Sequence, residues 1–257
     1  PIERAMAGTP GLVQVRSVSK LGISLVTLVF TDATDLYFAR AQVNERLALL
    51  RGVIPTDVGR PELGPIATGL GEIYMTEVRG EGRSLEELRT IVEWTLVPRL
   101  RQVPGVVEVV GFGGAFKQYR VTLDPARLAA HQISVEDVRS ALQRDNAVSG
   151  GGYVERHGEH VVLRADGRFR SLEDIADTMV TVQGSTPIKV GQLGEVDTGP
   201  ALRHGAMTAD GRGEVVGASV LMLKGENSRE VVARVKAALA ELAPRLPRGV
   251  EVVPYYD

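Results

Sequence analysis

Two glutamates and a pair of histidines are the side chains in this chain best suited to bind a cation. Glu72 opens one alternating, β-branched segment, and Glu108 lies between Val107 and Val109 in another. Because side chains alternate along a strand, we expect Glu108 on the opposite face from those valines, and Glu77 on the opposite face from Glu72. Carboxylates bind hard or borderline divalent cations, and imidazole adds selectivity. For each glutamate taken alone, a solvated or ion-paired surface role is the alternative.

The two histidines are His157 and His160, which flank Gly158-Glu159. This spacing fits the tip of a β-hairpin better than a helix. With the nearby acids, the pair has the ligand types for weak zinc binding. A solvated loop is the alternative, because a hairpin tip offers few rigid groups to orient the imidazoles.

Other chemistries are disfavoured by what the chain contains. Cysteine is absent, which excludes thiolate metal sites, disulfides and cysteine nucleophiles. The five methionines are scattered without a close pair, a pattern typical of core filling that favours divalent cations over copper or silver. Glycines cluster at 111–114 and 150–152 but match neither a dinucleotide fingerprint nor a phosphate-binding loop, and no nucleophile elbow is present. The sequence therefore predicts no enzyme active site and no cofactor.

Composition is that of an ordinary packed protein. The 257 residues are 44% hydrophobic and 24% charged, with a net charge of −2, so no basic bias indicates nucleic-acid binding. The longest apolar stretches fall far short of the roughly 20 residues that a membrane-spanning helix needs. The chain begins with Pro and no leader follows, so we expect it to be part of a longer protein.

The elements that would position these residues follow two periods. Amphipathic helices are predicted after capping residues, which are Asp35, Ser84, Ser134, Ser171 and Asn227. Half-buried strands are predicted at 13–18, 24–30, 72–78, 106–110, 118–123, 161–164, 215–223 and 250–255. Turns at Lys20-Leu21-Gly22 and at 111–114 join consecutive strands, so each is predicted to close a hairpin.

An internal repeat organises these elements. The segment 9–15 is echoed by 103–109, with the Pro-Gly pairs 94 positions apart, and each copy leads from a helix end into a strand. The repeat predicts two related α+β units, each a two-layer split β-α-β sandwich. We expect the first at 1–79, lacking its first strand, and the second at 80–123 and 212–257. Residues 124–211 would form an inserted α+β subdomain.

Several separated motifs, in order along the whole chain, resemble one family. They are Pro10-Gly11, the segment 30–40, Glu62 to Pro65 with Thr68-Gly69, the segment 103–109, Gly113-Gly114, Asp124 to Leu128 and Gly225 to Ser228. Together they resemble the first large periplasmic loop of the heavy-metal efflux pumps among the resistance-nodulation-division (RND) transporters. The resemblance implies that the two repeat units are ferredoxin-like porter subdomains and that the insertion is a docking subdomain.

The same resemblance implies a function. Family members are trimeric, proton-driven inner-membrane antiporters that pass metal cations to a periplasmic adaptor and an outer-membrane channel. This chain would then be a periplasmic part of an inner-membrane pump in a Gram-negative-type bacterium, joined to the membrane only through other segments. Glu72 and Glu108 match acidic cation contacts of the zinc-exporting branch, so zinc, cobalt, nickel or cadmium is the expected cargo. A soluble ligand-binding module with paired ferredoxin-like domains, or a drug exporter of the superfamily, is the alternative.

Overall fold

The computed structural model describes residues 1–55, 58–156, 158–203 and 205–257. The chain divides into two compact units, Pro1–Ile66 and Ala67–Asp257. Within the described segments, no helix has both the length and the apolar character needed to cross a membrane.

The first unit is a hairpin covered by two helices. Its elements are α1 (Ile2–Met6), β1 (Leu12–Lys20), β2 (Ile23–Phe30) and α2 (Leu36–Leu49). β1 and β2 pair in antiparallel fashion, which confirms the predicted hairpin at Lys20-Leu21-Gly22. Arg46 on α2 donates to the carbonyl oxygens of Ala5 and Ala7 at 2.8 Å each, which fastens α2 to the end of α1.

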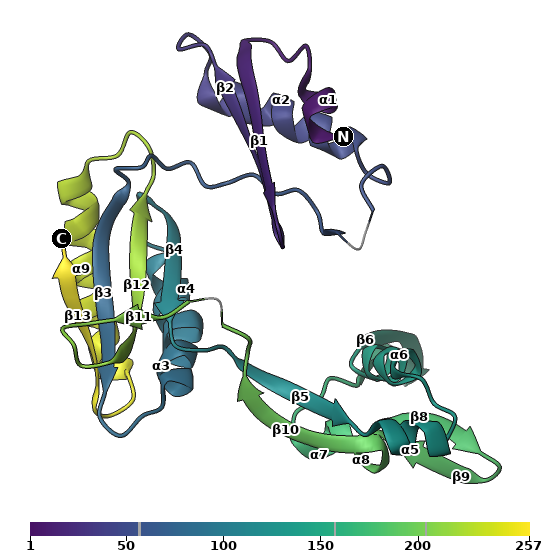
Figure 1. The fold of residues 1–257 in the computed structure, drawn as a ribbon. Helices are drawn as coiled ribbons and strands as arrows, with labels where there is room; N and C mark the ends of the chain where they lie inside the picture. Colours follow the sequence, from purple (N-terminus) through teal and green to yellow (C-terminus); the bar gives the residue numbers. More distant parts are fainter. Residues whose placement is uncertain (56–57, 157, 204) are drawn as a thin grey trace. The chain divides into compact units, whose positions relative to one another are not determined.

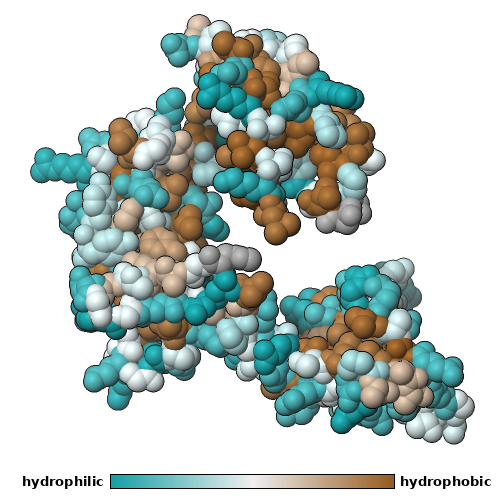
Figure 2. All heavy atoms as spheres, in the orientation of Figure 1, coloured by the Kyte–Doolittle hydropathy of each residue, from teal (hydrophilic) through white to brown (hydrophobic). Residues whose placement is uncertain are grey.

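Few side chains of this unit are buried. Only Met6, Ala39 and Val43 form its described apolar interior, whereas many strand residues remain exposed. Figure 2 shows apolar atoms over much of the surface of this unit, which is the upper body in Figure 1. A two-stranded sheet can bury little, because it offers only one narrow face to its helices.

The second unit is built on a five-stranded sheet with the order β13-β3-β12-β4, in which the short β11 also pairs with β12. The strands are β3 (Glu72–Gly80), β4 (Val106–Gly113), β11 (Met207–Thr208), β12 (Glu214–Met222) and β13 (Val250–Tyr256). The helical connections are α3 (Leu85–Ile91), the π-helical segment Val92–Leu96, α4 (Val97–Leu100) and α9 (Ser228–Leu242), which is followed by a 3₁₀ turn, Ala243–Arg245. β12 lies between β3 and β4, so the β3-helix-β4 unit is split by a strand. This arrangement confirms the predicted split β-α-β class.

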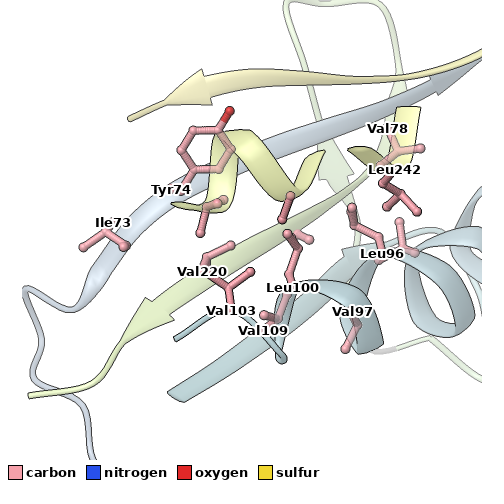
Figure 3. Close-up of a cluster of buried hydrophobic side chains, with 14 of the residues drawn as sticks. Ile73, Tyr74, Val78, Leu96, Val97, Leu100, Val103, Val109, Val220 and Leu242 are labelled. Atoms are coloured by element: carbon pink, nitrogen blue, oxygen red, sulfur yellow. The ribbon is translucent and has the colours of Figure 1, made fainter. Parts of the chain in front are cut away.

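The helices cover one face of this sheet, and the main core lies between the two layers (Figures 1 and 3). This core includes, from the sheet, Tyr74 and Val78 of β3, Val109 of β4 and Val220 of β12, and from the helical layer Leu96. We call the opposite side of the five-stranded sheet the outer face. Ser84 caps α3 with a complete capping box, as its sequence predicts.

Two predicted pairings differ from the structure. The strand predicted at 72–78 falls within the expected first porter subdomain, 1–79, but β3 hydrogen-bonds to β12 and β13 of the second unit, and the division of the chain falls between Ile66 and Ala67. The turn at 111–114 was predicted to close a hairpin, but β4 pairs with β12 instead of β5. Gly113 and Gly114 both have positive φ there, and the chain leaves the sheet at this point.

The segment from β5 to β10 forms short helices and two-stranded sheets with a core of their own. β5 (Lys117–Leu123), which was predicted within the second porter subdomain, pairs with β10 (Gly194–Pro200) of the insertion. Between them lie α5 (Pro125–Ala130), α6 (Val135–Asp145), β6 (Val148–Arg156), β7 (Glu159–Asp166), α7 (Leu172–Ala176), β8 (Met179–Gln183), β9 (Thr186–Lys189) and α8 (Val190–Leu193). A second core gathers Leu128, Ile133, Val138, Val190 and Leu193. The β6–β7 hairpin is exposed along its described length.

Candidate cation site

The outer face of the five-stranded sheet carries both predicted glutamates in one row. Glu72 of β3 and Glu108 of β4 are each the register partner of Leu221 on β12. Directly opposed residues of an antiparallel sheet project to the same face. Two strand spacings of about 4.8 Å separate the glutamates, so their Cα atoms are about 10 Å apart. Two glutamate side chains and two metal–oxygen bonds of about 2.1 Å suffice to bridge that span above Leu221.

A β-bulge explains why Glu77 shares this face, contrary to the alternation count. Glu77 pairs with Gly217, and Glu72 pairs with Leu221, although one extra residue lies between them on β3. The register shifts between Val220 and Leu221, so one residue of β3 is accommodated without a partner. The prediction that Glu77 lies on the opposite face from Glu72 was therefore wrong. For Glu108, the predicted opposition to Val109 holds, because Val109 is in the core and Glu108 is not. Val107 does not join that core, and the register shifts beside it, between Leu221 and Met222.

Glu77 is nevertheless committed to a structural role. It is 6% exposed and forms ion pairs with Arg79 at 2.9 Å and with Arg212 at 3.3 Å. The hydrogen bond from Arg79, opposed in part by burial, holds the pKa of the Glu77 carboxyl below its ordinary value. Two guanidinium groups already satisfy this carboxylate, so Glu77 is a poor cation ligand in this arrangement.

The Glu108 carboxylate is held at the edge of the sheet. It accepts a hydrogen bond from the backbone amide of Val109 at 3.1 Å and forms an ion pair with Arg101, just beyond the end of α4. The carboxylate thus has a positively charged partner in this structure, and a cation would compete with that partner. No sequence pattern indicates a role for Arg101, because the helix end and the strand meet only through the fold of the intervening Pro-Gly turn.

Glu72 lies at the rim of a hollow. A cavity of about 550 Å³ is lined by Glu72 together with residues of α9 and β13, including Lys236 and Tyr256. Nearby, burial is the main cause that raises the pKa of Tyr255, and the charge of Glu72 adds to it. Glu72 is exposed, so its carboxylate is accessible to an ion from solvent.

One further polar group on the outer face was not singled out from the sequence. Ser219 lies between Met75 and Val110 in the next row, is 3% exposed, and has no hydrogen-bond partner for its hydroxyl among the described residues. A buried hydroxyl without a partner costs free energy. No sequence signal distinguishes this serine from others on strands.

The histidine pair is only partly described. His157 lies outside the described residues. His160 lies on β7, where its Nε2 atom is 2.9 Å from the Glu155 carboxylate and its ring stacks on Tyr153 with 4.6 Å between centroids. Across the described ranges, no group of three or more His, Cys, Asp or Glu side chains is arranged to hold a metal ion. Among the residues that the structure describes, the candidate cation site is therefore a two-carboxylate partial site on the outer face.

The sequence and the fold match a family of transporters. The model of the AcrB/AcrD/AcrF family matches residues 1–257, so the chain belongs to that family. Its relatives place it in the heavy-metal branch of the RND transporters.

Three relatives illustrate the similarity. The cobalt-zinc-cadmium resistance protein CzcA of Cupriavidus metallidurans is 43% identical over 266 residues, covering 100% of this chain and 25% of CzcA. The cation efflux system protein CusA of Escherichia coli K12 is 38% identical over 260 residues, again covering 100% and 25%. A crystal structure of a heavy metal efflux pump superposes with a TM-score of 0.88 at 35% identity and covers 100% of this chain and 26% of that one. The chain spans about a quarter of the length of these relatives.

Proposed function

We propose that this chain is the periplasmic porter and docking part of a proton-driven efflux pump for divalent heavy-metal cations. The observation that carries the proposal is the row Glu72–Leu221–Glu108 on the outer face of the second unit's sheet. Two carboxylates about 10 Å apart, without further ligands beside them, favour transient cation binding over permanent capture. A transported ion must also leave, so an incomplete ligand set suits a pump.

The ligand chemistry favours zinc, cobalt, nickel or cadmium over copper and silver. Carboxylate oxygens suit hard and borderline ions, whereas monovalent copper and silver favour thiolate or thioether sulfur. The chain has no cysteine, and the candidate row contains no methionine. One relative is named for resistance to cobalt, zinc and cadmium, which agrees with this preference.

Two glutamates do not complete a zinc site, since zinc takes four ligands. We infer that the remaining ligands are water or side chains from other parts of the pump. The insertion, with predicted bounds 124–211, would be the docking region toward an outer-membrane channel. A periplasmic adaptor and homotrimer formation in an inner-membrane pump complete the proposed assembly. Export would follow from tilting of the porter subdomains, which alters the ligand set around the ion.

Metal resistance of a whole pump tests this proposal. The corresponding quarter of CzcA would be replaced by this chain, and growth of a zinc- and cobalt-sensitive bacterial strain would be measured on both metals. We expect the chimaera to restore growth and Glu108→Gln or Glu72→Gln to abolish most of it.

The matched control is Glu86→Gln, which alters a half-buried glutamate in the first turn of α3, away from the candidate row, and should leave resistance unchanged. Immunoblots would establish equal amounts of each protein. Full resistance with both Glu72 and Glu108 replaced would refute the proposed role of the pair.

A further inference from the structure

Arg101 is placed to control the availability of the Glu108 carboxylate. It follows α4, in the helical layer, and its guanidinium reaches Glu108 near the start of the edge strand β4. The arginine side chain is 52% exposed and the glutamate side chain 29% exposed. The contact therefore faces solvent and can open without unpacking the core.

The same carboxylate oxygen carries both contacts seen in the structure. Oε1 of Glu108 pairs with Arg101 and also accepts from the Val109 amide. These contacts draw the carboxylate to the edge of β4. A cation bridging to Glu72 requires the carboxylate to turn inward across Leu221, which is the shared register partner of both glutamates. A bridging cation would therefore draw the carboxylate away from Arg101.

We propose that Arg101 is a positioning residue that serves as an internal counter-ion for Glu108 and competes with the transported cation. This inference rests on the proposed function, because it takes Glu108 as a cation ligand. An incoming divalent cation displaces the guanidinium, and Arg101 re-forms the ion pair when the cation leaves. The ion pair lowers the affinity of the site for the cation. When no cation is bound, it also neutralises the charge of the Glu108 carboxylate.

The expected effect follows from the strength of exposed ion pairs. Such pairs contribute about 0.2–1 kcal/mol, so removing Arg101 should tighten divalent-cation binding by about 1.4- to fivefold. Arg101→Lys keeps the charge and should remain closer to the parent chain. Lysine provides a single ammonium group rather than the planar guanidinium of arginine. The cation affinity of Arg101→Lys should therefore fall between those of the parent chain and Arg101→Ala.

Titration calorimetry with zinc chloride on the 257-residue chain tests this. Arg99→Ala is the matched control, because Arg99 lies on α4 two residues earlier, carries the same charge and pairs instead with Glu241 at 2.6 Å. We expect tighter zinc binding for Arg101→Ala only. In the parent chain, the NMR signal of the Arg101 side-chain N–H should also shift on zinc addition, and Glu108→Gln should abolish that shift.

Two failures are distinguishable. If Glu108→Gln leaves zinc affinity unchanged in both the parent chain and Arg101→Ala, the assignment of Glu108 as a ligand fails. If Glu108→Gln weakens binding but Arg101→Ala behaves like Arg99→Ala, Glu108 is a ligand and the competition by Arg101 is overturned. Circular dichroism would verify that every variant is folded.

Discussion

Arg89 should be the most sensitive charged residue of the second unit. Its side chain donates to the carbonyl oxygens of Gly111 and Gly113 at 2.8 Å each, where β4 leaves the sheet. It also pairs with Glu93 at 2.8 Å and stacks over the ring of Phe116 at 4.3 Å. The residue is 8% exposed, so water cannot readily replace these partners.

The magnitude follows from these contacts. Each hydrogen bond from a charged donor contributes about 1.5–3 kcal/mol. Burial of the guanidinium and its Nε atom, which lacks a hydrogen-bond partner among the described residues, offsets part of that gain. We expect Arg89→Met, which keeps most of the apolar stem, to lower the free energy of unfolding by about 2–4 kcal/mol.

Urea denaturation of the 257-residue chain measures this loss. Arg99→Met is the control, because Arg99 forms an exposed ion pair with Glu241 and should cost less than about 1 kcal/mol. Hydrogen exchange should also accelerate over 111–116 in Arg89→Met, since this arginine fastens that segment. A loss no larger than that of Arg99→Met, with unchanged exchange, would refute the anchoring role of Arg89.

Three other substitutions test separate features. Folding lowers the pKa of Glu77 from 4.5, so its contribution to stability is present above that pH and is lost as the pH falls further. The Glu77→Gln variant should therefore be less stable than the parent at pH 7 by about 1–2 kcal/mol. In urea titrations it should lose less stability than the parent below pH 4.5, and an identical pH profile would contradict this. Gly217→Ala places a Cβ 2.3 Å from the Thr76 carbonyl oxygen and should cost about 1–3 kcal/mol, whereas a neutral result in thermal melts would rule out the close strand contact. Ser84→Ala removes a capping box and should cost about 1 kcal/mol, and an unchanged melting temperature would count against the cap.

Local patterns predicted most helix starts and one hairpin. Asp35, Ser84 and Ser134 cap helices in the structure, since a side chain near the first turn satisfies its own neighbouring amides. The hairpin at Lys20-Leu21-Gly22 needs only adjacent residues as well. These features depend on contacts a few positions apart, which the sequence displays directly.

Non-local pairing was harder to predict. The turn at 111–114 joins two strands that are consecutive in the sequence, but they do not pair with each other. The partner of β4 is β12, which comes about one hundred residues later because the insertion separates them. Likewise, nothing local assigns β3 to the second unit, since its partners β12 and β13 lie far along the chain.

The candidate site shows the same limit. Alternation located Glu108 opposite Val109, but placing Glu72 on the same face as Glu77 required knowledge of the bulge near the start of β3, which is defined by the register of the partner strand. The ion pair between Arg101 and Glu108 likewise arises where a helix end meets a strand. Pairing in three dimensions therefore decided which acids are accessible and which are neutralised.

We propose that Glu72 and Glu108 bind one divalent cation together. A double-mutant cycle with Glu72→Gln, Glu108→Gln and the double variant, read as the zinc affinity of the 257-residue chain, distinguishes a shared ion from two independent ones. If both carboxylates bind the same ion, each single variant should weaken binding, and the double variant should be little weaker than either one, a coupling of about 1 kcal/mol or more. Zinc affinity that is unchanged in the double variant, or losses that simply add, would contradict a shared site.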